Sequence, residues 1–189
     1  MMGIGIMQLF IILVLPFLIY GVVKHNLFVK LRNNRESTFA DIDVLLKQRH
    51  DLINQLVSTV KGYASHEKET LNSVVNARNE AMYARNIDEK MVAENRLNYA
   101  LTGLKVTIEA YPELKANSNF LQLQEKISDI ENKLATVRMY FNSSTREYNT
   151  AIEMFPASFF AALFRFQKEK MFDLGSSERQ NLHNTSTNF

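Results

Sequence analysis

The first twenty-three residues contain no charged side chain, and this feature constrains the fold more than any other. The stretch from Ile4 to Val23 is almost entirely apolar. As a helix that rises about 1.5 Å per residue, it spans roughly 30 Å, which is the thickness of the hydrocarbon core of a bilayer. A helix also satisfies its own backbone polar groups in lipid. The sequence therefore predicts a transmembrane anchor at residues 4–23, preceded by a short tail at residues 1–3.

A cleaved secretory signal is the alternative interpretation of this segment. Such a signal begins with positive charge, has an apolar stretch of about 7–15 residues and ends in small residues at a cleavage site. Residues 1–10 contain no positive charge, and the apolar stretch continues through Tyr20 and Gly21 to Val23. The chain also has no cysteine that a lipid could modify. An uncleaved anchor is the better interpretation.

Basic residues follow the apolar segment directly. Lys24, Lys30, Arg32 and Arg35 precede the first acidic residue, Glu36. Lysine and arginine near the end of a span favour the cytoplasmic side of the membrane. We therefore expect a single-pass protein of the plasma membrane, with its N-terminus outside and its remaining chain in the cytoplasm. The net charge of +2 gives no indication of a nucleic-acid partner.

Helical periodicity dominates the rest of the chain and predicts an all-α fold. Apolar residues recur at steps of three and four residues in four long segments, followed by a short helix after Pro156. The segments are 27–60, which is potentially continuous with the anchor, about 65–86, 89–110, and 118–155. Short connections favour antiparallel neighbours, so we expect an elongated antiparallel bundle at residues 24–174. Residues 175–189 are polar, lack a stripe and are expected to be disordered.

A long parallel coiled-coil dimer is the competing architecture. The apolar residues of segment 89–110 alternate by four and three, as in a heptad seam. Turns near Gly62 and Pro112 interrupt the pattern, however, and proline disfavours a helical conformation in the residue before it. The antiparallel bundle is therefore preferred.

Several sequence segments allow a comparison with a known family. In order they are NLFVKLRN (26–33), IDVLLKQRHDLI (42–53), LVSTVKGYA (56–64), EAYPELKAN (109–117), NFLQLQ (119–124), EYN (147–149) and FP (155–156). From the anchor to about Phe172, the chain closely resembles the LemA family of bacterial membrane proteins. The resemblance implies a membrane helix followed by a bundle of long antiparallel helices. It implies no known reaction, and it points to envelope stress and membrane proteases as a biological setting.

Two arginines fall on the predicted apolar stripes. Arg49 lies between Leu45 and Leu52, and Arg78 occupies the equivalent place in the second segment. A buried guanidinium requires partners, and Glu109 and Glu131 are candidates for that role. In the preferred interpretation, both arginines pack their stems in the core and extend their charged ends to water. A structural role is favoured over ligand binding.

The sequence predicts no catalytic residue and no cofactor. His66 and Glu67 begin like a zinc protease motif, but Thr70 stands where the second histidine belongs. Glu125 and Asp129 are four residues apart on one helical face and are weak candidates for binding a divalent cation. Such a pair is more often solvated surface.

An aromatic segment near the C-terminus has two interpretations. Phe159, Phe160, Leu163 and Phe164 are followed by Arg165, Lys168 and Lys170. The segment either covers one end of the bundle or forms an interfacial helix on anionic lipid.

Taken together, these features predict a membrane-anchored interaction protein without catalysis, which acts as an oligomeric scaffold or an adaptor. Its expected partners are the lipid bilayer, further copies of the chain, and membrane proteins such as a protease. The alternative function is a metal- or phosphate-responsive binding module built in a helical bundle. A hydrolase is a third and weaker interpretation.

Overall fold

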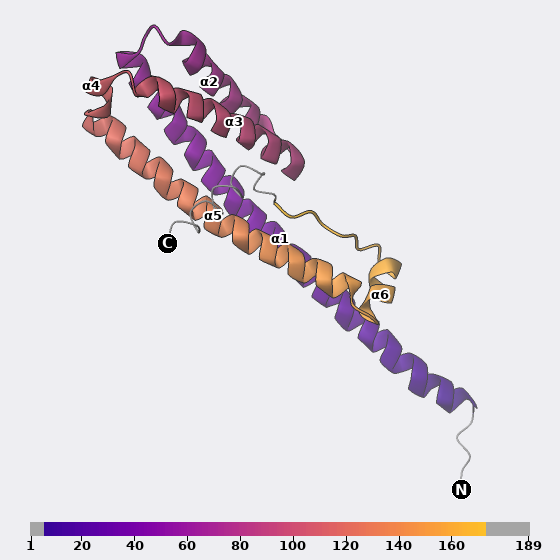
Figure 1. Ribbon diagram of the computed structural model, residues 1–189. Coiled ribbons are helices and arrows are strands. Elements are labelled where there is room, and N and C mark those ends of the chain that lie inside the picture. Colours follow the sequence, from indigo (N-terminus) through magenta and orange to yellow (C-terminus); the bar gives the residue numbers. More distant parts are fainter. Residues whose placement is uncertain (1–5, 173–189) are drawn as a thin grey trace, which may run out of the picture. The chain divides into compact units, whose positions relative to one another are not determined.

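The structure, a computed structural model, describes residues 6–172 of the 189-residue chain. Within that range it contains only helices and connecting segments, with no strand. The helices are α1 (Ile6–Tyr63), α2 (Lys68–Tyr83), α3 (Ile87–Ile108), α4 (Pro112–Lys115), α5 (Ser118–Glu153) and α6 (Ala157–Leu163) (Figure 1). The predicted all-α fold is confirmed, and from Ile6 onward the expected membrane segment is continuous with the first long helix.

The described residues form two compact units. The anchor unit comprises residues 6–40 and 139–171, and the four-helix unit comprises residues 41–138 and 172. Helices α1 and α5 each contribute residues to both units. The predicted domain limits at residues 4, 24 and 174 remain predictions, and the tails at 1–3 and 175–189 lie outside the described residues.

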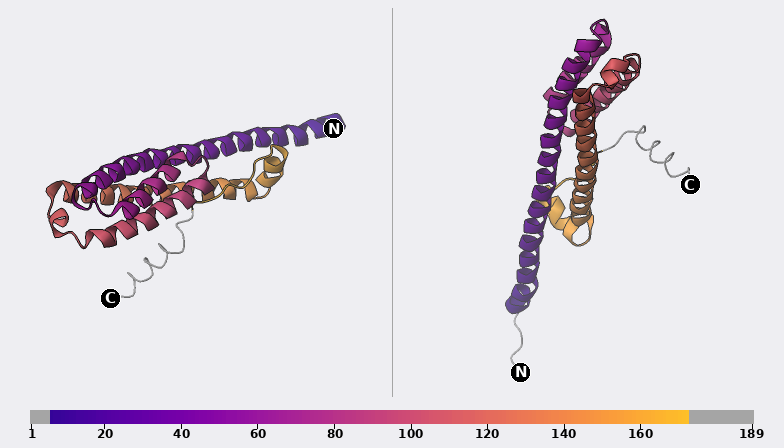
Figure 2. Two further views of the ribbon diagram at one scale, coloured as in Figure 1. Left: turned by 90° about the horizontal axis from the view of Figure 1, so that it is seen from above. Right: turned by 90° about the vertical axis from the view of Figure 1, so that its left-hand side faces the viewer.

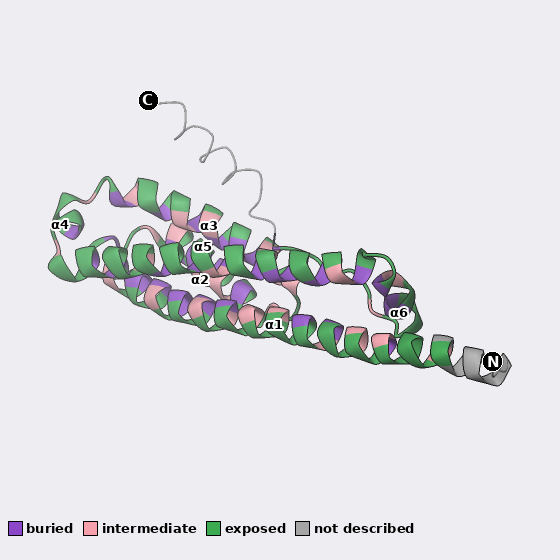
Figure 3. Ribbon diagram, turned by 90° about the horizontal axis from the view of Figure 1, so that it is seen from below, coloured by how far each residue is buried: buried purple, intermediate pink, exposed green. Residues whose placement is uncertain are grey.

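The four-helix unit is held together by the apolar stripes that the periodicity predicts. The C-terminal part of α1, helices α2 and α3, and the first half of α5 run up, down, up and down (Figure 1). Their buried faces turn toward one another (Figure 3). The core contains Ile53, Leu56, Val57, Val60, Leu71, Val74, Leu97, Leu104, Ile108, Leu114, Phe120 and Leu123. Burial of these side chains is the main stabilising contribution.

Local capping groups set the helix ends in this unit. The side chain of Asn86 accepts a hydrogen bond from the Glu89 backbone N–H and begins α3. The side chain of Asn117 accepts a hydrogen bond from the Phe120 N–H and begins α5. Pro112 ends the preceding helix as predicted, but it also begins the short helix α4, which the apolar pattern did not predict. Proline suits a first helical turn because its missing N–H needs no partner there.

The anchor unit combines the N-terminal part of α1, the end of α5, helix α6 and the segment after it. Helix α6 lies beside α1 in each view (Figure 2). The core of this unit consists of Phe28, Leu31, Tyr148, Ile152, Ala157 and Ala161. The apolar residues of α1 before this core, from Leu15 to Ile19, are exposed.

Candidate functional site

The four basic residues after the predicted span lie on α1 in the anchor unit. Lys24 Nζ lies 5.3 Å from the centre of the Tyr20 ring. Lys30 is exposed, and Arg32 faces Glu36 at 3.9 Å on the helix surface. Arg35 is the most enclosed of the four and contacts residues from α5 and from the C-terminal segment. The basic cluster is therefore partly a structural element.

Arg35 holds the segment that follows α6. Its guanidinium donates hydrogen bonds to the Lys170 carbonyl and the Thr145 hydroxyl, and it pairs with Glu169 at 3.2 Å. The guanidinium also lies 4.8 Å from the centre of the Phe141 ring. These contacts join three stretches that are distant in sequence, as is usual for an arginine that offers five donors.

Two residues of α5 hold the same segment by its backbone. The Tyr148 hydroxyl donates to the Gln167 carbonyl at 3.0 Å, and burial raises the pKa of this phenol. The Asn149 side chain donates to the Glu169 carbonyl and accepts from the Glu169 N–H, both at 2.8 Å. Residues 167–170 are not helical. The side chains of Tyr148 and Asn149 therefore supply hydrogen bonds to backbone groups that a helix would pair internally.

Helix α6 is seated against the predicted span. The Phe160 ring lies 4.8 Å from the Phe17 ring and 5.7 Å from the Tyr20 ring, measured between centroids. A Cβ atom added at Gly21 would lie 2.5 Å from Phe160 Cε1. Glycine at this position therefore permits the aromatic ring to approach the backbone of α1.

The four aromatic and aliphatic residues proposed at this end of the chain separate into two groups. Phe160 is 3% exposed and faces the span, whereas Phe159, Leu163 and Phe164 are exposed. The structure thus assigns a packing role to Phe160. Whether the other three contact lipid remains a prediction.

A charge cluster is buried in the four-helix unit. Arg49 Nη1 of α1 lies 2.5 Å from Glu94 Oε2 of α3, and His50 Nε2 lies 2.7 Å from the other carboxylate oxygen. Arg49 also donates to the side chains of Asn98 and Glu131. Arg49, His50 and Glu94 are each almost fully buried. This arrangement satisfies a buried carboxylate through two cationic or donor groups from the neighbouring helix.

The electrostatic surroundings keep Glu94 ionised. Burial opposes ionisation and is the largest single influence on this carboxyl group. The hydrogen bond from His50 and the charge of Arg49, with smaller contributions from the charges of His50 and Arg138, together outweigh burial. The pKa of Glu94 is therefore below its ordinary value of 4.5.

The cluster differs from the sequence-based expectation. Arg49 does not reach water, because its side chain is 4% exposed and Glu94 neutralises it within the core. Of the two expected mates, Glu131 lies 3.2 Å from Arg49, and Glu109 instead pairs with Lys115 on the surface. The preferred interpretation that Arg49 extends to solvent was wrong.

Arg78 is also enclosed, though less completely. Its Nε donates to the His50 carbonyl at 2.7 Å, and its Nη2 lies 3.9 Å from the exposed Asp51. Arg78 therefore joins α2 to the turn of α1 that contains the charge cluster. It contacts neither Glu109 nor Glu131 in the bonds that the structure shows for it.

The sequence contains a signal that Glu94 is buried, although Glu94 was not among the expected partners of Arg49. Glu94 continues the three-and-four alternation of Leu97, Leu101 and Leu104 by one step toward the N-terminus. A charged residue in an apolar seam is a sign of a buried partner. His50, next to Arg49, had no comparable signal, because its role depends on how α1 and α3 align.

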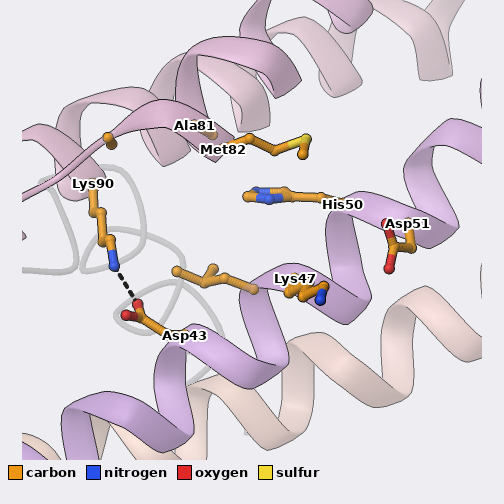
Figure 4. Close-up of a pocket in the computed structure, with 9 residues that line it drawn as sticks. Asp43, Lys47, His50, Asp51, Ala81, Met82 and Lys90 are labelled. Atoms are coloured by element: carbon orange, nitrogen blue, oxygen red, sulfur yellow. Dashed lines mark hydrogen bonds and ion pairs between the residues drawn. The ribbon is translucent and has the colours of Figure 1, made fainter.

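A surface hollow of about 280 Å³ adjoins the charge cluster. His50 and Leu46 of α1 and Met82 of α2 line it, together with Lys90 of α3, whose ammonium lies 2.5 Å from Asp43 (Figure 4). His50 thus borders the hollow and also contacts the buried Glu94. The lining has both charge signs, which does not favour one class of ligand.

The weak metal candidates lie on the surface of α5. Glu125 and Asp129 are both exposed. Within residues 6–172, no group of three or more histidine, cysteine, aspartate or glutamate side chains is arranged to hold a metal ion. Metal binding by this pair remains a weak prediction.

An exposed stripe on α3 was not recognised from the sequence. Val92, Tyr99 and Val106 are seven residues apart and all exposed, and Tyr99 is 85% exposed. An open hollow of about 630 Å³ between α2 and α3 adjoins Val92 and Tyr99. A seven-residue repeat places side chains on one face of a helix. The regular spacing was available in the sequence, but its exposure depends on which face of α3 the bundle covers.

Comparisons with known proteins identify the family of this chain. The model of the LemA family matches residues 38–187. Protein LemA of Metamycoplasma hominis is 25% identical, over 91% of this chain and 83% of that protein. Magnetosome protein MamQ of Magnetospirillum gryphiswaldense is 21% identical, over 90% of this chain and 74% of that protein. Magnetosome protein MamQ 2 of Paramagnetospirillum magneticum is 19% identical, over 89% of this chain and 71% of that protein.

The family match covers most of the chain and includes every residue of the buried charge cluster, the exposed stripe on α3 and helix α6. It begins after the predicted span and the four basic residues that come directly after that span. This helical protein, with its apolar N-terminal helix, belongs to the LemA family.

Proposed function

We propose that the protein is a membrane-anchored helical interaction protein that acts without catalysis. In this proposal α1 crosses the bacterial inner membrane once, with the N-terminus outside, and the four-helix unit lies in the cytoplasm. The protein serves as an oligomeric scaffold or as an adaptor for another membrane protein, such as a protease. The resemblance to the LemA family is the source of the link to membrane proteolysis and envelope stress.

The membrane part of the proposal is supported by the exposure of the apolar segment. Helix α1 is the one helix among the described residues that is long and apolar enough to cross a membrane. Only 17% of its most apolar window is buried, whereas the core helix of a soluble protein would be mostly buried. The basic residues from Lys24 to Arg35 then favour a cytoplasmic location for the rest of the chain.

The exposed stripe on α3 is the observation on which the interaction role depends. Aromatic side chains are enriched at the centres of protein interfaces, and an apolar seven-residue repeat suits contact with another helix. Tyr99, with Val92 and Val106 on either side, provides such a surface in the four-helix unit. A second copy of the chain and a helical partner protein are both compatible with this surface.

Site-specific photo-crosslinking in membranes tests this role. With a photoreactive phenylalanine analogue at Tyr99, we expect a discrete adduct after irradiation. An adduct of twice the monomer mass would support the scaffold, and an adduct with one other protein would support the adaptor. The same analogue at exposed Lys105, off the stripe on α3, is the matched control. If position 99 gives no adduct, or no more than position 105, the proposed contact surface is wrong.

A further inference from the structure

Helix α6 is almost entirely apolar. Its seven residues, ASFFAAL, include no charged side chain and one polar residue, Ser158. The inner face, with Ala157, Phe160 and Ala161, is buried against the rest of the anchor unit. A helix that is apolar all round belongs either in a protein core or in a membrane. The outer face of α6 therefore requires an apolar covering.

The outer face of α6 presents large apolar side chains. Phe159 and Leu163 are four residues apart, 56% and 63% exposed, and therefore lie on the same side of the helix. Phe155, in the turn before α6, is 88% exposed. We call these three exposed side chains the outer row; the Phe159 ring also contacts the Phe160 and Phe17 rings, with centroids 5.4 and 5.9 Å away.

The contacts of α6 with α1 fix the depth of α6 relative to the predicted span. Phe160 contacts Phe17, Tyr20 and Gly21 of α1. These residues precede Lys24, the first charged residue, by at most seven positions, or roughly 10 Å along the helix. Interfacial helices bury their apolar faces about 5–10 Å below the headgroups. If α1 spans a bilayer, α6 is therefore held at the depth of the headgroup and acyl boundary.

The charges of the anchor unit complement an anionic surface. Residues 24–40 and 139–171 contain eight lysines and arginines and four glutamates. Residues 41–138 contain thirteen basic and fourteen acidic residues, so the positive excess is confined to the anchor unit. Arg165, Lys168 and Lys170 follow α6 directly and are exposed. Basic residues near an anionic leaflet are attracted to its headgroups.

We infer that α6 is an interfacial membrane element whose outer row inserts among the acyl chains of the cytoplasmic leaflet, while the surrounding basic residues contact anionic headgroups. This inference rests on the proposed function, because it requires α1 to span the bilayer. It adds a second membrane contact that orients the anchor unit: the span holds the chain in the bilayer, and α6 fixes its rotation and height at the surface.

The absence of cysteine in the native sequence allows a direct test by spin labelling. Full-length variants with a single nitroxide at Leu163→Cys or Phe159→Cys are reconstituted in vesicles of phosphatidylcholine, with or without phosphatidylglycerol. Accessibility is measured to oxygen, which concentrates in lipid, and to a neutral nickel chelate, which stays in water. Lys105→Cys, on α3 but off the exposed stripe, is the water-exposed control, and Leu18→Cys reports insertion of the span. All four native side chains are exposed, so the substitutions remove no buried side chain.

We expect the Leu163 and Phe159 labels to be accessible to oxygen and protected from the nickel chelate, and to lie deeper when phosphatidylglycerol is present. If both labels behave like the Lys105 label while the Leu18 label is in lipid, the inference is overturned and the anchor stands. Labels that are immobile and protected from both reagents would indicate a protein partner on the outer row and would also overturn it. If the depth of the two labels is the same with and without phosphatidylglycerol, the inferred contact between the basic residues and anionic headgroups is wrong. A Leu18 label in water would contradict the anchor itself.

Discussion

Replacing Glu94 by glutamine is expected to lower the free energy of unfolding by about 3 kcal/mol, because it removes the buried counter-charge of Arg49 and leaves only the half-exposed Glu131. Glutamine preserves the shape of the side chain and one hydrogen-bond acceptor, so the loss reports the charge. Urea unfolding of the full-length chain in lipid nanodiscs, followed by circular dichroism, gives the free energy. The matched control is Glu131→Gln, which removes the half-exposed partner of the same arginine and should cost less than about 1 kcal/mol.

The effect of Glu94→Gln should also depend on pH. The pKa of Glu94 is lowered in the folded protein, so the unfolded chain binds more protons at this position as the pH falls. The stabilisation is complete above the ordinary pKa of 4.5 and is lost as the pH falls through the folded value. The difference between wild type and Glu94→Gln should therefore shrink in acid. A variant as stable as wild type at neutral pH would show that the cluster does not stabilise the fold.

The second large effect is expected in the predicted span. Arginine at Leu15 and Leu18 should displace the chain from the membrane, because each arginine costs about 2.5–3.5 kcal/mol at the centre of a span. Both native residues are exposed, so the substitutions disturb no core contact. The fraction of protein that remains in membranes after an alkaline wash measures the effect.

The chain provides a closely matched control for this pair. Val44 is 57% exposed, as is Leu18, and Val92 and Leu15 are both 54% exposed. The variant with Val44→Arg and Val92→Arg therefore adds the same charge at equal exposure, outside the span. It should stay in the membrane fraction. If both double variants lose membrane binding equally, residues 4–23 are not the anchor.

Much of the fold could be predicted because helical periodicity is a local property. Ile42, Ile53 and Val60 of the first long segment are buried, as are Leu97 and Leu104 of the heptad-like seam, as the spacing predicts. The helix ends were also close, since Asn117 and Pro112 act within one turn of the backbone. Such features need no knowledge of how distant segments pair.

The candidate site could not be predicted to the same extent because it depends on pairing between distant segments. The partner of Arg49 depends on the register between α1 and α3, which places Glu94 rather than Glu109 beside it. The contact between Phe160 and Gly21 likewise depends on how the end of α5 packs against α1. Sequence spacing identified the residues of α6 as a group, and only packing separated the inward Phe160 from its exposed neighbours.

The most direct test of the account is the side of the membrane on which the four-helix unit lies. Single cysteines at Gly3 and at exposed Lys105, off the stripe on α3, can be introduced into the cysteine-free chain and treated with a membrane-impermeant maleimide in intact spheroplasts. We predict that Gly3→Cys is labelled at once and that Lys105→Cys is labelled only after lysis. Labelling of Lys105→Cys in intact spheroplasts would contradict a cytoplasmic interaction protein anchored by its N-terminal helix.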